Sequence, residues 1–149
     1  MPVRSSNSSV LRWPDRQTID RATRGWAETL RRQRPHVLRI GYFGSYARGQ
    51  WGVGSDLDVI VIVKASPHRF ERRSAEWNTT ELPIPVDLFV YTRDEWEAFD
   101  RQSRFYQTVL REAVWVYNEQ CAVPEHLTPD VGRSSAGRTR SFVRLSCRL

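Results

Sequence analysis

The chain has 149 residues, of which 40% are hydrophobic and 27% are charged, so we expect one soluble domain with a single hydrophobic core. Lysine and arginine number 23 against 17 aspartate and glutamate, and the net charge of +6 suggests an anionic partner without identifying it. No run of residues approaches the roughly 20 apolar positions of a membrane span, and the N-terminus lacks the apolar stretch of a secretory signal, so we expect a cytoplasmic protein without membrane contact.

The first part of the chain is predicted to contain a polar arm, a helix and a strand. Residues 1–12 are rich in serine and are expected to be flexible. A helix is expected over 14–32, with Pro14 at its first position, because apolar side chains recur at three- and four-residue spacing: Ile19, Ala22, Trp26 and Leu30. Residues 36–43 are predicted to form a strand.

A Gly-Ser turn at Gly44 and Ser45 follows this strand, and a short helix is expected over 46–49. Residues 50–55 contain two glycines and are predicted to be a loop. The clearest predicted strand is DLDVIVIV, residues 56–63, whose β-branched side chains suggest burial on both faces.

The second half is predicted to alternate helices with strands and to complete a domain over 13–119. A helix is expected over 67–78, with a solvated charged face formed by Arg69, Glu71, Arg72 and Arg73. Thr92 and Glu95 fit a capping box that starts another helix. The remaining predicted elements are a strand over 86–91, a helix over 103–112 and a strand over 114–117.

Residues 120–149 show no clear period and contain five arginines against two acidic residues. We expect this segment to be a basic, disordered tail. The tail therefore accounts for much of the net positive charge, which weakens the hypothesis of a basic nucleic-acid-binding face on the folded part.

Asp56 and Asp58 lie two positions apart in a predicted strand, so their side chains point to the same face. Carboxylates placed side by side repel each other and resist burial beside an apolar strand. A divalent cation removes this conflict, and hard oxygen ligands suit Mg²⁺. Asp87, alone among apolar residues in VDLFV, completes the cluster if its strand pairs beside the first. Three carboxylates can hold two metal ions, which clamp the attacking and leaving oxygens of a displacement at phosphorus.

The turn at Gly44 and Ser45 is a candidate phosphate site. Such a turn exposes backbone N–H groups and a hydroxyl where a helix begins, an arrangement that suits a phosphate. Arg48, one helical turn along, is a candidate for a further phosphate contact, although an exposed arginine is ordinary in so arginine-rich a chain.

The stretch GSYARGQWGVGSDLDVIVIV, with Asp87 downstream, resembles the DNA polymerase β-type nucleotidyltransferase superfamily. Its minimal members carry Gly-Ser, a ten-residue gap, Asp-x-Asp and a third aspartate on a later strand. The resemblance implies an α/β (α+β) fold with a small mixed sheet flanked by helices, two Mg²⁺ ions, and a nucleoside triphosphate, expected to be ATP, as donor. It implies that Asp56 and Asp58 bind metal and that Asp87 binds the catalytic metal and helps to deprotonate the acceptor. Gly44 and Ser45 are then expected to hold the triphosphate.

The chain looks most like the minimal, stand-alone (MNT-type) nucleotidyltransferases, because its length leaves no room for the extra domains of larger members. These proteins resemble the antitoxin of two-gene pairs with a HEPN-type toxin, which implies transfer of AMP from ATP to a tyrosine of the toxin.

Three alternatives remain open at this point. The first is a non-catalytic antitoxin that neutralises its partner by contact. The second is an aminoglycoside-type nucleotidyltransferase with an acceptor pocket supplied by a second subunit, which would make the protein a homo-oligomer. The third, RNA or DNA binding through the basic surface, is the least favoured.

Overall fold

The structure is a computed structural model that describes residues 12–119 of the chain. The predictions of a flexible arm over 1–12 and of a basic tail over 120–149 fall almost entirely outside the described residues. Within the described range, none of the helices is both long enough and apolar enough to cross a membrane.

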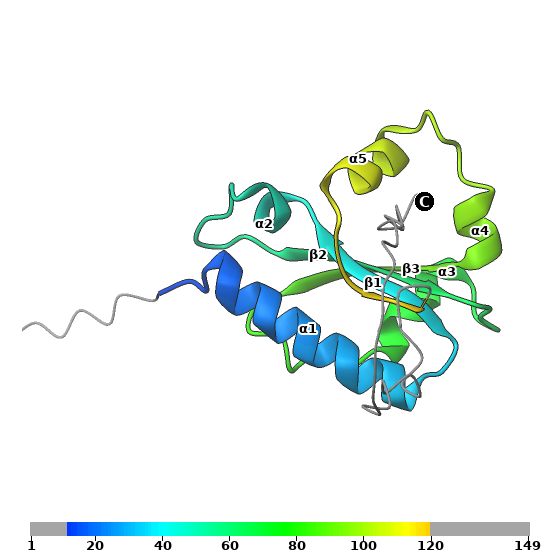
Figure 1. The fold of residues 1–149 in the computed structure, drawn as a ribbon, viewed down its shortest axis with the longest axis horizontal. Coiled ribbons are helices and arrows are strands. Elements are labelled where there is room, and N and C mark those ends of the chain that lie inside the picture. The colour runs from blue at the N-terminus through cyan, green and yellow to red at the C-terminus, as the bar shows by residue number, and fades with distance from the viewer. Residues whose placement is uncertain (1–11, 120–149) are drawn as a thin grey trace, which may run out of the picture. The chain divides into compact units, whose positions relative to one another are not determined.

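The described chain forms four strands: β1 (Val37–Phe43), β2 (Leu57–Val63), β3 (Val86–Thr92) and β4 (Val114–Asn118). They make one mixed sheet in the spatial order β3-β2-β1-β4 (Figure 1). Strand β1 is antiparallel to both of its neighbours, β2 and β4, whereas β2 and β3 are parallel. Each strand begins and ends within one residue of its predicted range.

Helices cover both faces of this sheet (Figure 1). Helix α1 (Arg16–Gln33) packs on one face, and α4 (Arg93–Glu97) and α5 (Arg104–Glu112) pack on the other. The shorter helical segments are α2 (Ser45–Arg48), α3 (Phe70–Arg73) and the 3₁₀ turn η1 (Ser74–Glu76). A small mixed sheet flanked by helices confirms the predicted α+β fold class.

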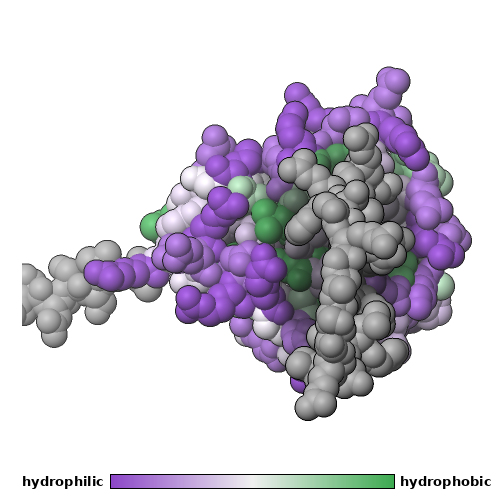
Figure 2. All heavy atoms as spheres, viewed as in Figure 1, coloured by the Kyte–Doolittle hydropathy of each residue, from purple (hydrophilic) through white to green (hydrophobic). Residues whose placement is uncertain are grey.

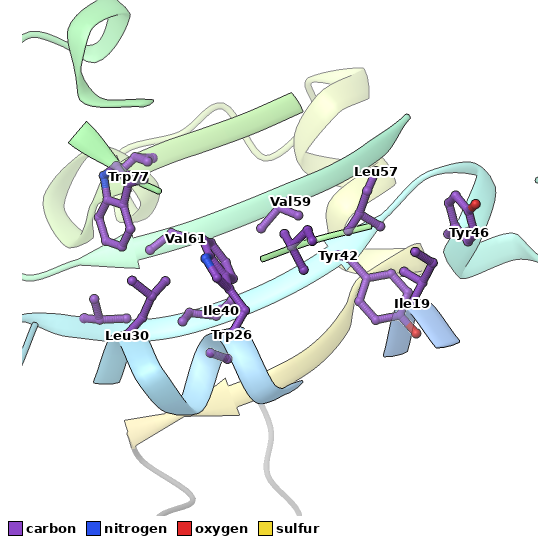
Figure 3. Packing of buried hydrophobic residues seen from close by; sticks show 14 of the residues in the cluster. Ile19, Trp26, Leu30, Ile40, Tyr42, Tyr46, Leu57, Val59, Val61 and Trp77 are labelled. Atoms are coloured by element: carbon purple, nitrogen blue, oxygen red, sulfur yellow. The ribbon is translucent and has the colours of Figure 1, made fainter. Parts of the chain in front are cut away.

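The side chains of β2 are buried on both faces of the sheet, as predicted from its β-branched sequence. The odd-numbered residues from 57 to 63 belong to the hydrophobic cluster beneath α1, where Trp26 and Leu30 lie between the helix and the strands (Figure 3). Ile60 and Ile62 belong to the cluster on the opposite face, with side chains of α4 and α5. The alternation that places these two isoleucines also decides which face the polar residues at the start of the strand occupy.

Helix α1 begins after Asp15, whose Oδ1 accepts a hydrogen bond from the backbone N–H of Thr18 at 2.8 Å. The prediction that Pro14 is the first helical residue is therefore wrong. Pro14 precedes the cap, and its carbonyl oxygen accepts a hydrogen bond from the Tyr46 hydroxyl at 3.1 Å. The predicted apolar stripe is confirmed, since its larger members are buried: Ile19, Trp26 and Leu30.

The predicted helix over 67–78 is wrong in its extent. Only the short segments α3 and η1 form there, and the chain becomes extended at Trp77 (φ −105°, ψ 122°). Trp77 is buried in the cluster beneath α1, and the guanidinium carbon of Arg34 lies 4.6 Å from its ring centre. Burying this large aromatic side chain outweighs a weak helical pattern, and the local sequence does not contain that tertiary effect.

Three of the four residues predicted for a solvated helix face are exposed: Arg69, Glu71 and Arg72. The prediction is wrong for the fourth, Arg73, which is buried. Its Nη2 donates to Oε1 of Glu95 on α4 at 2.9 Å and its Nη1 donates to Oε2 of the same carboxylate at 2.5 Å. The guanidinium also donates to the carbonyl oxygens of His68 and Val90. Arg73 therefore joins α3, β3 and α4.

The capping box predicted at the start of α4 is confirmed. The Thr92 N–H donates to Oε2 of Glu95 at 2.9 Å, and the Glu95 N–H donates to the Thr92 hydroxyl at 3.3 Å. The hydrogen-bonded guanidinium of Arg73 lowers the pKa of Glu95 from 4.5 to about 2. One carboxylate thus stabilises both the helix start and the buried arginine.

Replacing Glu95 by glutamine is expected to lower the free energy of unfolding by about 1 kcal/mol at neutral pH, a modest value because the carboxylate is half-exposed. Because folding lowers the pKa of Glu95, the ion pair contributes fully above pH 4.5 and loses its contribution as the pH falls through about 2. Urea unfolding near pH 7 and near pH 2 measures this dependence. A stability difference between the two proteins that stays constant over this range would contradict it.

Candidate active site

Asp58 of β2 and Asp87 of β3 are direct partners in the parallel register of the two strands. Their Cα atoms are therefore separated by one strand spacing, roughly 4.8 Å. Asp58 lies two positions before Ile60 in β2, and Asp87 lies two positions before Phe89 in β3. Side chains two positions apart in a strand point to the same face, so both carboxylates lie on the face of the sheet where α4 and α5 pack. Asp56 immediately precedes β2. The fold thus places all three predicted carboxylates at the amino-terminal ends of two neighbouring strands.

The charges of Asp56 and Asp87 both act unfavourably on that of Asp58. Burial raises the pKa of Asp58, which is half-buried, and the charges of Asp87 and Asp56 raise it further. Among residues 12–119, none of the three carboxylates has a hydrogen-bond or ion-pair partner. An arrangement of like charges without a cation is costly, and a bound cation would relieve it.

The donor chemistry of this cluster suits a divalent cation such as Mg²⁺, which prefers carboxylate oxygens. Within the described part of the chain, however, no three acidic, histidine or cysteine side chains converge closely enough to hold a metal ion. Asp56 and Asp87 are exposed, so their side chains can rotate toward Asp58 without disturbing the core. The residues therefore fit the ion in type and in place, and binding requires this rotation.

Gly44 packs directly against Asp58. It follows β1, whose last residue, Phe43, pairs with Asp58 in the antiparallel register. Gly44 has φ 76° and ψ −148°, a conformation that favours glycine, and a Cβ at this position would collide with Oδ2 of Asp58. The Gly-Ser turn and the second aspartate of the Asp-x-Asp motif are therefore parts of one tightly packed unit.

Helix α2 begins at Ser45, so the predicted short helix is present and starts one residue earlier. Because α2 has only four residues, few peptide dipoles align along it, and its N-terminus alone is a weak attraction for an anion. A phosphate at this place would depend on the N–H groups and the hydroxyl of the turn.

Tyr46, the residue after the Gly-Ser turn, anchors the turn in the hydrophobic core. The Tyr46 side chain is fully buried, and its ring stacks on that of Trp51 with the centres 5.5 Å apart and the planes 3° from parallel. This stack fixes the beginning of the loop that leads to Asp56. The chain on the amino-terminal side of the Asp-x-Asp motif is thus held at its beginning by aromatic packing.

Arg48 is paired with a residue that the sequence reasoning missed. Its Nη1 donates to Oε2 of Glu112, the last residue of α5, at 2.7 Å, and its Nε donates to Oε1 of Gln50 at 3.0 Å. Both Arg48 and Glu112 act electrostatically on Asp58, the arginine lowering its pKa and the glutamate raising it. The pair is separated by 64 positions in sequence, so only the placement of α5 reveals it.

The family model of the nucleotidyltransferase domain matches residues 24–116, which is more than half of the chain. The chain belongs to this family. The matched range contains the Gly-Ser turn, the Asp-x-Asp motif and Asp87. No curated protein matches the sequence significantly.

One solved structure agrees with this assignment at the level of the fold, and two others are similar to a lower degree. The nucleotidyltransferase domain aligns with a protein of Sulfolobus solfataricus that is provisionally classed as a nucleotidyltransferase, with a TM-score of 0.52 and 17% identity over 71% of this chain and 86% of that one. A toxin–antitoxin structure with AMP-PNP aligns with a TM-score of 0.49 and 22% identity, over 65% of this chain and 74% of that one. A mutant of the toxin–antitoxin MntA-HpeT aligns with a TM-score of 0.47 and 19% identity, again over 65% of this chain and 74% of that one.

Proposed function

We propose that this nucleotidyltransferase domain transfers AMP from ATP to a hydroxyl group of a partner protein in a Mg²⁺-dependent reaction. The observation that carries the proposal is the packing of Gly44 against Asp58, with Asp87 beside it in register. This packing brings the candidate phosphate-binding turn and the candidate metal ligands together. Phosphoryl chemistry depends largely on such positioning and on charge neutralisation.

In the proposed mechanism, Asp56, Asp58 and Asp87 hold Mg²⁺. When bound, the ion neutralises charge on the triphosphate and on the transition state. The turn at Gly44 and Ser45 holds the triphosphate through its N–H groups and hydroxyl. The exposed carboxylate of Asp87 accepts the proton of the acceptor hydroxyl. The acceptor oxygen then forms a bond to the α-phosphorus, the bond from the α-phosphorus to the bridging oxygen breaks, and pyrophosphate leaves.

The openness of the site supports a macromolecular acceptor. Asp56, Asp87 and Arg48 are all exposed, whereas sites for small molecules bury most of the ligand surface. A pocket of about 440 Å³ in the described part of the chain lies elsewhere, around Tyr91 and Phe99. The resemblance of the motif to minimal nucleotidyltransferases supports a tyrosine of a HEPN-type toxin as the acceptor, and this domain would then act as the antitoxin.

The described surface supports nucleic-acid binding less than it supports a protein partner. Hydrophilic residues cover most of the described surface visible in Figure 2, including the outer side of α1. Three exposed arginines of α1, however, are paired with acidic residues of the same helix: Arg24 with Asp20, and Arg31 and Arg32 with Glu28. These pairs reduce the positive potential that a phosphate backbone would require.

The purified chain, incubated with ATP labelled at the α-phosphate, Mg²⁺ and host lysate, is expected to give a labelled protein band. ATP labelled at the γ-phosphate is expected to give no band that depends on the chain, because the γ-phosphate leaves in pyrophosphate. Denaturing gel electrophoresis with autoradiography measures both results. A label found only on a small molecule would favour the aminoglycoside-type alternative over a protein acceptor. If no product carried the label, the proposed transfer would be overturned.

A further inference from the structure

Two residues hold the guanidinium of Arg48, which still has N–H groups available for a ligand. An arginine side chain has five N–H groups. Two of them are used, by Gln50 and by Glu112, and the others have no partner among residues 12–119. The side chain of Arg48 is 41% exposed, whereas that of Glu112 is only 11% exposed. The arginine is therefore fixed at its inner side and open to solvent at its outer side.

Arg48 lies close to both parts of the proposed site. Its backbone N–H donates to the carbonyl oxygen of Gly44 at 3.0 Å, which places it one helical turn from the Gly-Ser turn. Its charge also acts on Asp58. A planar guanidinium with free N–H groups at such a place matches the geometry of phosphate oxygens.

The location of Glu112 is unfavourable for a carboxylate that has no cationic partner. It is nearly buried, it ends a helix where the dipole disfavours negative charge, and it lies near enough to Asp58 to repel it. The ion pair with Arg48 offsets this cost, and Arg111 contributes a second, longer contact at 3.5 Å. The carboxylate and the guanidinium thus constrain each other.

We infer that Glu112 is a positioning residue, which orients the Arg48 guanidinium so that its free N–H groups bind the triphosphate of the donor nucleotide. The inference rests on the proposed function, since it deepens the account of the same site. Glu112 itself does not touch the nucleotide. Without its carboxylate, Arg48 remains charged but samples several rotamers, and binding must restrict them at an entropic cost.

The test is Glu112→Gln, which keeps the size of the side chain and an acceptor oxygen but removes the charge. We expect the KM for ATP to rise about 10-fold, with kcat changed less than about 3-fold, because the lost contact is made equally in the ground state and the transition state. Titration calorimetry with a non-hydrolysable ATP analogue should show the same loss of affinity without turnover. Glu112→Asp, which keeps the charge, should recover part of it.

A double-mutant cycle separates positioning from mere stabilisation of the fold. Arg48→Ala should weaken binding at least as much as Glu112→Gln, and the double variant should be no weaker than Arg48→Ala alone. The matched control is Glu119→Gln, which breaks the exposed Lys64–Glu119 pair and should change neither KM nor affinity. The inference would be overturned if Glu112→Gln bound the analogue as tightly as the wild type. It would also be overturned if the losses of affinity in the two single variants added up in the double variant.

Different results would contradict the proposed function and the inferred role of Glu112. If the wild-type chain transfers no label and does not bind the analogue, the proposed function itself fails. If the wild-type chain is active and Glu112→Gln behaves identically, only the role of Glu112 fails.

Discussion

Replacing Asp58 by asparagine is expected to lower the rate of nucleotidyl transfer by at least about 1,000-fold and, at the same time, to stabilise the fold. The rate falls because Asp58 is the most central of the three candidate metal ligands, between Asp87 in register and Gly44 in contact. The stability rises because the variant removes a half-buried charge that two neighbouring carboxylates repel. Loss of activity with gain of stability distinguishes a functional residue from a structural one.

The pH dependence of this gain follows from the raised pKa of Asp58. Protonated Asp58 adds stability below its unfolded pKa near 3.8, and this contribution is lost as the pH rises through the higher folded pKa. The advantage of Asp58→Asn should therefore be absent in strong acid and complete at neutral pH. Thermal unfolding in EDTA across this range measures it, and added Mg²⁺ should raise the Tm of the wild type more than that of the variant. A variant less stable than the wild type at neutral pH would contradict this account of the site.

A second variant of the same site tests the antitoxin role. Asp56→Ala together with Asp58→Ala should abolish transfer while leaving partner binding intact, because both side chains lie at the ends of strands and outside the hydrophobic clusters. Co-purification with the partner and a growth assay measure binding and neutralisation. Full neutralisation by the double variant would favour the alternative in which this chain acts by contact alone.

Replacing Gly44 by alanine should have the largest effect of any substitution outside the three aspartates. An alanine at φ 76° and ψ −148° is strained on the order of 1–3 kcal/mol, and its Cβ would displace the carboxylate of Asp58. We therefore expect a lower unfolding midpoint and a loss of activity of about 100-fold, the cost of misplacing a catalytic group by roughly 1 Å.

Two other glycines provide graded controls for this prediction. Gly49 has φ 72° but open space around its Cβ position, so Gly49→Ala should lower stability without affecting transfer. Gly52 has neither the positive φ nor a close neighbour, so Gly52→Ala should resemble the wild type. Unfolding and transfer assays on the three variants should follow this order. Equal activity in Gly44→Ala and Gly49→Ala would show that the contact with Asp58 is unimportant.

The sequence predicted the elements whose information is local or periodic. The continuous β-branched run of β2 predicted a strand buried on both faces, and the box at Thr92 and Glu95 predicted a helix start, because each depends on neighbours in the chain. The three aspartates were identified because a motif places them on two strands. The register that makes Asp58 and Asp87 partners was only a conditional expectation, since strand pairing is a tertiary property.

The features that the sequence did not predict depend on long-range contacts. Arg73 belongs to a charged run that is typical of a solvated face, and its burial is explained by hydrogen bonds to the distant Glu95 carboxylate and Val90 carbonyl oxygen. Glu112 ends an ordinary amphipathic helix, and its approach to Arg48 depends on how α5 crosses the sheet. Trp77 leaves the helical geometry because the cluster beneath α1 accepts its ring. In each case packing, rather than local propensity, decides the outcome.

The mixed order of the sheet makes the site depend on two strand pairings at once. Gly44 and Asp58 come together when β1 pairs with β2 across the 13 residues 44–56, whereas Asp87 arrives only through the longer, parallel crossover of residues 64–85. A two-stranded pair is at best marginally stable in water by itself, so neither pairing alone holds its part of the site in place. Catalytic competence therefore requires the complete sheet, and any variant that loosens β3 should lower activity even where the turn and the Asp-x-Asp motif are unchanged.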